Sequence, residues 1–180
     1  NYLNEQGVTF KGTAEAGSRV YLTLSANGSA VVISPESVEV GQDGSWTYTL
    51  ASELSDGEYT YSFVAIDVAG NRSQVREGTI HMDTVPPTAV YTGISASTDS
   101  GMLDNDGITK EQMPVFEGTV NESAIVTVVL TAENGTRYVY TSGSFVNGSW
   151  SIQGTDNLPE GTYQVSVSAT DKAGNVGPVS

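Results

Sequence analysis

The segment Glu160–Asn175, EGTYQVSVSATDKAGN, contains the clearest structural signal of the sequence. Apolar and polar side chains alternate within it, in the order Tyr163, Gln164, Val165, Ser166, Val167, Ser168, Ala169. Successive side chains of a β-strand point to opposite faces, so this alternation is typical of an antiparallel strand with one buried face. The segment therefore predicts a strand with its aromatic and aliphatic side chains turned inward.

The same pattern occurs 104 residues earlier in Asp56–Asn71, DGEYTYSFVAIDVAGN. Two other pairs of segments match in the same order: GSWTYTL from Gly44 with GSWSIQG from Gly148, and FKGTAEAGSRV from Phe10 with FEGTVNESAIV from Phe116. The spacings are 104 and 106 residues. Matches in this order and at nearly constant spacing indicate two homologous units.

Each unit reads as a series of short strands separated by turn residues, with no helical pattern of useful length. In the second unit the expected strands are 88–94, 114–120, 125–131, 137–142, 150–154, 162–170 and a last one after residue 175. About seven short strands in roughly 100 residues favour an immunoglobulin-like sandwich. The predicted fold class is therefore all-β, with two tandem immunoglobulin-like β-sandwiches, the first incomplete, in an elongated rod.

Two aromatic pairs support the sandwich. Tyr59 and Tyr163 stand where a tyrosine corner would begin the sixth strand, although they also fit as ordinary inward aromatics. Trp46 and Trp150 follow Gly-Ser at a strand start. We expect them to be core anchors, with sugar stacking as the alternative.

The linker between the units is MDTVPPT, in which Pro86-Pro87 restricts the backbone to extended conformations and makes a stiff joint. The expected domains are residues 1–82 and 83–180. The first has only nine residues before its FKG motif, so it lacks the first strand of the second unit and the acidic loop that follows that strand. The sequence therefore predicts a window cut from a longer array.

Composition narrows the range of partners. The 180 residues include 21 acidic and 7 basic ones, for a formal net charge of −14. Such a surface repels nucleic-acid phosphates and anionic lipid, which argues against both as partners. Cysteine is absent, which excludes disulfides, zinc–thiolate sites and thiol nucleophiles. No stretch approaches the roughly 20 apolar residues of a membrane span, so no membrane insertion is expected.

The loop Asp99–Lys110, DSGMLDNDGITK, concentrates acidic and amide side chains. Carboxylates held close together repel one another unless a cation neutralises them. Ca²⁺ accepts many oxygens from flexible loops, whereas Mg²⁺ demands strict octahedral geometry, so Ca²⁺ is favoured. The closing glutamate and flanking helices of an EF-hand are missing. The alternative for Asp99, Asp104 and Asp106 is a solvated turn held by Asx hydrogen bonds.

The repeated D-x-AGN motif, at Asp67–Asn71 and Asp171–Asn175, allows two interpretations. Asp can bond its own turn while Gly and Asn tolerate positive φ, which makes a tight hairpin turn. Alternatively, the carboxylates contribute to a cation site. Local chemistry favours the turn. Immunoglobulin-like strand order places these loops at the end of each unit where its first strand begins, with the acidic loop at the opposite end.

Several motifs together resemble a known family. They are DTVPPT in the linker, TDSG and DNDGIT in the acidic loop, P-x-F-x-GT, the DGEY and EGTY corners, and D-x-AGN. In this order, and over nearly the whole chain, they resemble the tandem bacterial Ig-like repeats of giant type I-secreted surface adhesins, such as biofilm-associated proteins and the giant non-fimbrial adhesin of Salmonella.

The resemblance implies a non-catalytic, calcium-stiffened spacer that is secreted, retained at the bacterial cell surface and projects a distal adhesive tip. Partners would be neighbouring repeats and, through other domains, a host-cell or surface receptor, and the chain would be a monomer. Carried over by position, the implied Ca²⁺ ligands are Asp67, Asp83, Asp99, Asp104, Asn105, Asp106 and Asp171.

Two other classes of function stay open, a glycan-binding module and an accessory domain of a secreted hydrolase. An enzyme is not expected. A serine triad needs a histidine, and the single one is His81. The sequence contains no GxSxG motif, so we expect His81 to be an exposed strand-end residue. A glycosidase needs two carboxylates across a cleft, for which a small sandwich offers little room.

Overall fold

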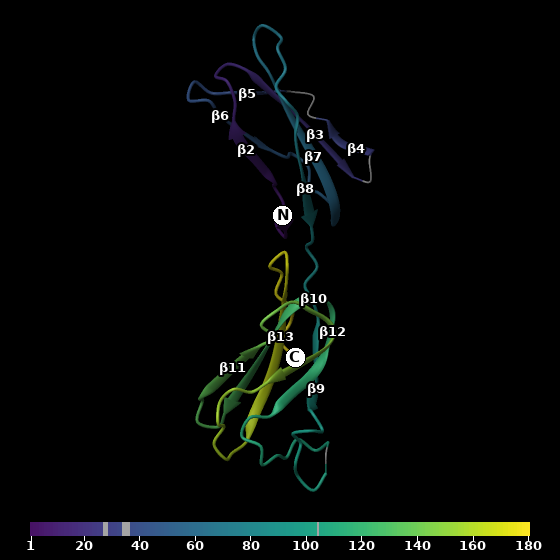
Figure 1. The fold of residues 1–180 in the computed structure, drawn as a ribbon, viewed down its shortest axis with the longest axis vertical. Helices are drawn as coiled ribbons and strands as arrows, with labels where there is room; N and C mark the ends of the chain where they lie inside the picture. Colours follow the sequence, from purple (N-terminus) through teal and green to yellow (C-terminus); the bar gives the residue numbers. More distant parts are fainter. Residues whose placement is uncertain (27–28, 34–36, 104) are drawn as a thin grey trace. The chain divides into compact units, whose positions relative to one another are not determined.

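The computed structural model describes residues 1–26, 29–33, 37–103 and 105–180. It divides into two compact units, Asn1–Thr84 (unit 1) and Val85–Ser180 (unit 2). All regular structure in the described part of the chain is β-strand (Figure 1). No helix that is long and apolar enough to cross a membrane occurs in those ranges.

Unit 1 contains two sheets. Its strands are β1 (Tyr2–Leu3), β2 (Thr9–Thr13), β3 (Arg19–Ala26), β4 (Ser29–Ile33), β5 (Val38–Glu39), β6 (Ser45–Thr49), β7 (Gly57–Ile66) and β8 (Arg76–Met82). The larger sheet has the order β1-β8-β7-β3-β4, with β5 on β3, and the smaller one pairs β2 with β6. Among the strands that the structure describes in this unit, β1 and β8 alone pair in parallel. The core lies between the sheets and includes Phe10, Leu22, Leu24, Trp46, Tyr59 and Ile80.

Unit 2 is organised around one long strand. Its strands are β9 (Ala89–Ile94), β10 (Val115–Ala132), β11 (Arg137–Thr141), β12 (Val146–Gln153) and β13 (Tyr163–Asp171). The first half of β10 pairs with β9 and β12, and its second half with β11 and β13. The pairing register with β12 shifts between Val120 and Ala124. Such an irregularity bends a strand, so β10 contributes one half to each layer of the sandwich.

The all-β class with two tandem sandwich units is confirmed, but two strand expectations for unit 2 are wrong. Segments 114–120 and 125–131 form one strand, because the backbone remains extended through the Asn121–Ser123 bulge instead of turning. After Asn175 no strand forms in the described residues. A single bridge joins Thr170 to Val176, and Ser180 exchanges two backbone hydrogen bonds with Val167.

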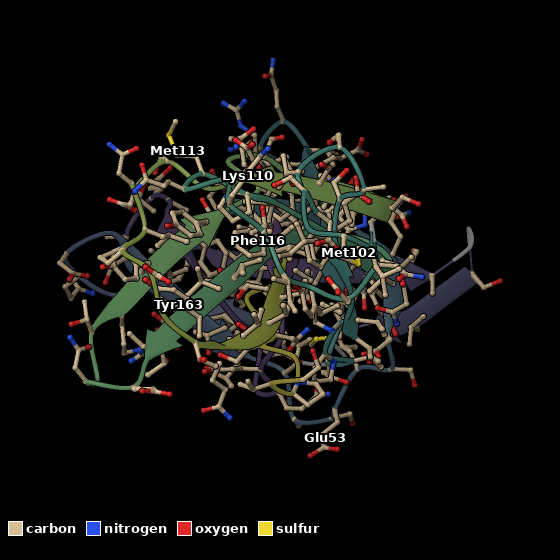
Figure 2. All side chains as sticks on the ribbon, turned by 90° about the horizontal axis from the view of Figure 1, so that it is seen from below. Glu53, Met102, Lys110, Met113, Phe116 and Tyr163 are labelled. Carbon is tan, nitrogen blue, oxygen red and sulfur yellow. The ribbon has the colours of Figure 1, made fainter. Side chains whose placement is uncertain are left out.

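The inward faces follow the alternation in the sequence. In β13, Val167 and Ala169 are each 1 % exposed, and Tyr163 and Val165 pack on the same core. Trp46 and Trp150 are buried core residues, as predicted. Figure 2 shows Phe116 of β10 among other side chains, while Met113 projects outward just before the strand.

Both tyrosine corners are confirmed. The Tyr59 hydroxyl donates to the Ser55 carbonyl at 2.8 Å, and the Tyr163 hydroxyl donates to the Pro159 carbonyl at 2.7 Å. Each bond ties the start of a strand to the loop four residues upstream. The corner therefore fixes how β7 and β13 leave their preceding loops.

Replacing Tyr59 by phenylalanine is expected to lower the free energy of unfolding of unit 1 by about 1 kcal/mol, since a partly buried hydrogen bond is lost. Urea denaturation measures the difference. Tyr48→Phe is the control, because the Tyr48 ring packs on the same core and its hydroxyl makes no hydrogen bond within the described residues. Equal losses in the two variants would contradict a specific role for the corner.

The glycine of the F-x-GT segment, which occurs in both units, faces a tryptophan. Gly12 pairs with Trp46 across β2 and β6, and Gly118 pairs with Trp150 across β10 and β12. A Cβ at Gly12 would lie 2.7 Å from Trp46 Cζ2, and one at Gly118 would lie 2.2 Å from Trp150 Cζ2. The motif therefore keeps a side chain out of the place that the indole ring occupies, a constraint that the sequence did not reveal.

Candidate functional site

The acidic loop joins β9 to β10 and is closed at its neck by hydroxyl groups. Thr109 Oγ1 donates to the Thr98 carbonyl and lies 3.2 Å from Ser100 Oγ. Thr98 Oγ1 in turn accepts a hydrogen bond from the Val115 amide at 3.0 Å. These contacts hold the first and last residues of the loop together where β10 begins.

Asp99 is the unusual residue of this loop because its carboxylate is only 4 % exposed. Its Oδ2 accepts a hydrogen bond from the Gly107 amide at 3.1 Å. Its Oδ1 is buried and has no hydrogen-bond partner among the residues that the structure describes. A buried charged oxygen without a partner costs free energy, so this atom is suited to a cation.

The charge of Asp99 affects the pKa of the Tyr91 hydroxyl. Burial raises the pKa of the Tyr91 hydroxyl, and the negative charge of Asp99 raises it further. Tyr91 is on β9, and its side chain packs against the core of unit 2. Tyr91 therefore offers a spectroscopic reporter of the charge at Asp99.

The other predicted ligands of the loop that the structure describes, Asn105 and Asp106, are more exposed. Asp106 Oδ1 accepts a hydrogen bond from the Ile108 amide at 3.0 Å, which is an Asx turn. Asn105 is exposed next to it, and Asp104 lies outside the described residues. Lys110, the loop's single basic residue, follows its closing threonine (Figure 2). The loop therefore places one buried carboxylate beneath an exposed acidic turn.

The two D-x-AGN segments form the same hairpin turn. Asp171 Oδ1 accepts the Gly174 and Asn175 amides at 2.7 and 2.9 Å, and Oδ2 accepts Asn175 Nδ2 at 2.8 Å. Asp67 Oδ1 accepts the Ala69 and Asn71 amides at 2.9 and 2.8 Å, and Oδ2 accepts Asn71 Nδ2 at 2.8 Å. The turn that the local chemistry favoured is therefore present in both units.

The two turns differ in burial and in acidic neighbours. Asp171 is 5 % exposed, whereas Asp67 is half-buried and its turn residues are exposed. Hydrogen bonds from Asn71, first from its side chain, hold the pKa of Asp67 below its usual value. A carboxylate oxygen of Glu122 lies within 4.8 Å of one from Asp171. In unit 1 the position matching Glu122 is Ala16, so that second carboxylate is missing.

Glu122 was missed by the sequence analysis. It lies in the bulge of β10, two residues before Ala124, which pairs with Asp171. An acidic residue in the short interval between two apolar runs was the available signal. Ala89, at the start of β9, pairs with Val120, while the acidic loop follows the far end of β9. Asp171 and Asp99 therefore lie at opposite ends of unit 2, as strand order predicted (Figure 1).

The linker is anchored at both of its ends. In unit 1, the Asp83 amide donates to the Leu3 carbonyl at 2.9 Å, and the Thr84 amide donates to Asp56 Oδ1 at 3.0 Å. In unit 2, Pro87 is fully buried, and the Thr88 amide donates to Asn121 Oδ1 at 2.7 Å. The half-buried Asp83 is thus one of the last residues that form hydrogen bonds within unit 1, and it lies just before the two prolines.

His81 is engaged in a local cluster. Its Nδ1 lies 3.5 Å from Glu58 Oε2, and its ring stacks on Tyr2 with centroids 4.6 Å apart. It is half-buried rather than exposed, because β1 pairs beside it. The described part of the chain contains no second histidine.

Several solved structures are similar to this chain. Solved structures similar to the chain include a tetra-tandem repeat in the extending region of a large adhesion protein, at 26% identity and a TM-score of 0.37. That match covers 95% of this chain and 43% of the other, so the chain spans less than half of that structure's length. Fibronectin(III)-like modules of Clostridium thermocellum CbhA match at 12% identity, a TM-score of 0.48 and coverages of 99% and 84%.

A third similar structure is the FN1–FN3 region of chicken CNTN1, at 16% identity and a TM-score of 0.40, with coverages of 100% and 65%. No curated protein matches the chain. The model of one family, described as bacterial Ig-like domain, matches residues 1–84 and again residues 86–180. The two matches span almost the entire sequence and coincide with the repeated motifs, so the chain belongs to the bacterial Ig-like domain family.

Proposed function

We propose that this chain is a non-catalytic stalk segment of a giant bacterial surface adhesin in which Ca²⁺ stiffens the joints between consecutive Ig-like units. The observation that carries the proposal is the buried Asp99 carboxylate, whose Oδ1 has no partner in the described residues. A divalent cation at this oxygen would replace an unfavourable burial with a strong electrostatic contact.

The acidic loop supplies the kind of ligands that Ca²⁺ prefers. Ca²⁺ takes about six to eight oxygens from carboxylates, amide side chains, backbone carbonyls and water. Asp99, Asn105 and Asp106 offer such oxygens, and we assign Asp104 to the same set. The cation would also screen the repulsion within a chain whose net charge is −14.

A second Ca²⁺ would bind where the chain enters unit 2. Glu122 and Asp171 bring two carboxylates there, and Asp83 precedes the buried Pro87 by four residues. Four extended residues span at most about 14 Å, so the linker is short enough for Asp83 to join them. In unit 1, Asp67 would need acidic partners from outside that unit, because Ala16 replaces the glutamate.

Binding at these places would have a mechanical result. Bridged carboxylates on either side of a linker would restrict bending, so that a distal tip is held away from the cell. Low cytosolic Ca²⁺ would leave the chain looser for type I secretion, and external Ca²⁺ would favour the compact form by mass action. The protein would be retained at the cell surface as a monomeric stalk, with host or surface attachment, virulence or biofilm roles assigned to other domains.

The test is calorimetric. Titration of Ca²⁺ into the chelator-treated chain should show saturable binding, and a concentration about 100 times Kd should stabilise the folded state by about 2.7 kcal/mol. Asp99→Asn should abolish binding at the acidic loop. Glu133→Gln is the matched control, because it removes one exposed charge from the same unit. If chelator changes neither the melting temperature nor the small-angle scattering profile, the proposal is wrong.

Tyr91 gives an independent measurement of the site. Because the charge of Asp99 helps to raise the pKa of Tyr91, neutralising that charge should lower it. Ca²⁺ should therefore move the alkaline absorbance change of Tyr91, isolated by subtracting a Tyr91→Phe titration, to lower pH. Asp99→Asn should cause the same shift without Ca²⁺ and remove the further response to it. If Ca²⁺ does not change the titration of Tyr91, the cation binds elsewhere.

A further inference from the structure

The outer face of the larger sheet of unit 1 is hollowed by a groove. Residues of β3, β7 and β8, which are neighbours in that sheet, line the groove (Figure 1). Besides Tyr61 and Gly78, the lining consists of Thr23, Ser25, Thr60, Ser62, Glu77 and Thr79. The volume is about 440 Å³. Pockets for small ligands measure about 300–1,000 Å³, so the groove is large enough for one.

The six hydroxyl and carboxylate side chains share one face because of the strand pleat. They alternate along β3 with Leu22 and Leu24, and along β8 with Ile80, all of which are buried in the core. Successive side chains of a strand point to opposite faces, so the six point away from the core. Strand pairing arranges them in two rows, one of Thr23, Ser62 and Glu77 and one of Ser25, Thr60 and Thr79. Paired residues lie about 5 Å apart, so one ligand can contact several of them.

The polar groups of the two rows are not used within the protein. None of these six side chains forms a hydrogen bond or an ion pair with the residues that the structure describes. Each of the five hydroxyls can both donate and accept, whereas the Glu77 carboxylate only accepts. None of the residues that line the groove is basic. The groove therefore offers hydroxyl groups and one unpaired negative charge.

The matching face of unit 2 has a different chemistry. At the spacings of 106 and 104 residues, Val129 matches Thr23 and Ser166 matches Ser62, and the two residues pair in the same way. Val129 has no hydroxyl, and Ser166 Oγ donates to the Val129 carbonyl at 3.4 Å. This row of unit 2 therefore lacks the hydroxyls that face solvent in unit 1, so the lining is not a general consequence of the fold.

An aromatic pair extends the same face beyond the second row. His81 follows Thr79 by two residues in β8, so its side chain lies on the same side, about 7 Å further along. Its ring stacks on that of Tyr2, which is 45 % exposed. Flat aromatic rings suit the C–H face of a sugar ring. A sugar chain that extends past Thr79 would therefore meet an aromatic surface.

We propose that this groove binds an oligosaccharide of amino sugars. The hydroxyls of the two rows exchange hydrogen bonds with sugar hydroxyls, and the Glu77 carboxylate pairs with an ammonium group of the sugar. Charge complementarity favours an amino sugar over an acidic one, because the groove holds one negative charge and the chain carries a net charge of −14. An added peptide strand is disfavoured, because β3, β7 and β8 are each paired on both sides.

The experiment uses the whole ¹⁵N-labelled chain in chelator, with a glucosamine tetramer as the probe. The amide resonances of the two rows should shift saturably, and those of the matching face of unit 2 should not. A tetramer of N-acetylglucosamine, in which the amine is blocked, should bind more weakly. A tetramer of galacturonic acid should not bind, because its carboxylates are repelled by Glu77.

Two variants separate the hydroxyl contacts from the charge. Thr23→Val introduces the residue of unit 2 at nearly constant size and should weaken binding about fivefold, as expected for one lost hydrogen bond. Glu77→Gln should remove the preference for glucosamine over N-acetylglucosamine. Thr131→Val is the matched control, because Thr131 matches Ser25 on the same face of unit 2, and it should leave the affinity unchanged.

Four results would each overturn the proposal. They are the lack of a saturable shift in the two rows with the glucosamine tetramer, equal binding of the galacturonic acid tetramer, an unchanged affinity in Thr23→Val, and pentalysine binding to the same amides as tightly as the sugar. The last would identify a site for cationic peptides. Working in chelator separates this result from the calcium test, since either proposal can fail while the other holds.

Discussion

Gly118→Ala is expected to lower the free energy of unfolding of unit 2 by about 3 kcal/mol, at the upper end of overpacking effects. The added Cβ would lie 2.1 Å from the Val90 carbonyl oxygen and 2.2 Å from Trp150 Cζ2. The carbonyl belongs to the paired backbone of β9, and Trp150 is 3 % exposed in the core, so neither can retreat without loss of pairing or packing. The change therefore forces β9 away from β10 or moves the Trp150 ring from its place in the core.

Gly12→Ala is the matched control in unit 1. The three atoms nearest to its Cβ would all belong to the ring of Trp46, the closest at 2.7 Å, whereas the atom nearest to the Gly118 Cβ is a backbone oxygen, so a smaller loss of about 1 kcal/mol is expected. Each unit contains one tryptophan, so fluorescence during urea denaturation reports on one unit at a time. Gly118→Ala is measured in a Trp46→Phe background, and Gly12→Ala in a Trp150→Phe background that keeps the Trp46 ring. Equal losses in the two units would show that the β9 backbone does not constrain Gly118.

Asp171→Ala should be nearly as damaging, with a loss of about 3 kcal/mol in unit 2 when measured in chelator. The Asp171 carboxylate accepts three hydrogen bonds from Gly174 and Asn175 while only 5 % exposed. Removing it leaves donors in a closely packed turn without an acceptor. Thermal and urea denaturation measure the loss. Lys172→Ala removes an exposed side chain whose Nζ lies 5.6 Å from the Phe145 ring centroid, so this control should cost at most about 1 kcal/mol.

Asp67→Ala tests the same motif at a more solvent-exposed turn. The hydrogen bonds are equivalent, but the turn residues of unit 1 are exposed and water can replace the carboxylate, so a smaller loss is expected. The pKa of Asp67 is lowered in the folded state, so its contribution is present above the unfolded pKa and disappears as pH falls through the folded one. An Asp67→Ala penalty that persists at acid pH would contradict this assignment.

The sequence was most informative where one residue's neighbours lie within its own repeat. Alternation in β7 and β13 depends only on the pleat, and the tyrosine corners span four residues, so both were predictable. The turn at D-x-AGN was also predictable because its donors are local. The bulge that joins two expected strands into β10 was not, because it depends on the pairing of Ala124 with Val146 and Asp171.

The candidate site shows the same division. The acidic loop can be recognised from its composition. That Asp99 is buried and Asp106 is not depends on how the loop packs against the sandwich. Glu122 approaches Asp171 because β10 and β13 pair, although the residues are far apart along the chain. Local patterns carry no information on such approaches.

By itself, then, the sequence determined the all-β class, the two repeated units, their inward faces and the acidic character of their loops, since these follow from side-chain periodicity, spacing and charge. Only the tertiary structure decided which carboxylate oxygen is buried without a partner among the described residues, and which glycines must lack a side chain. These properties depend on contacts between segments distant in the chain, where a difference of one or two ångströms separates a satisfied atom from an unpaired one.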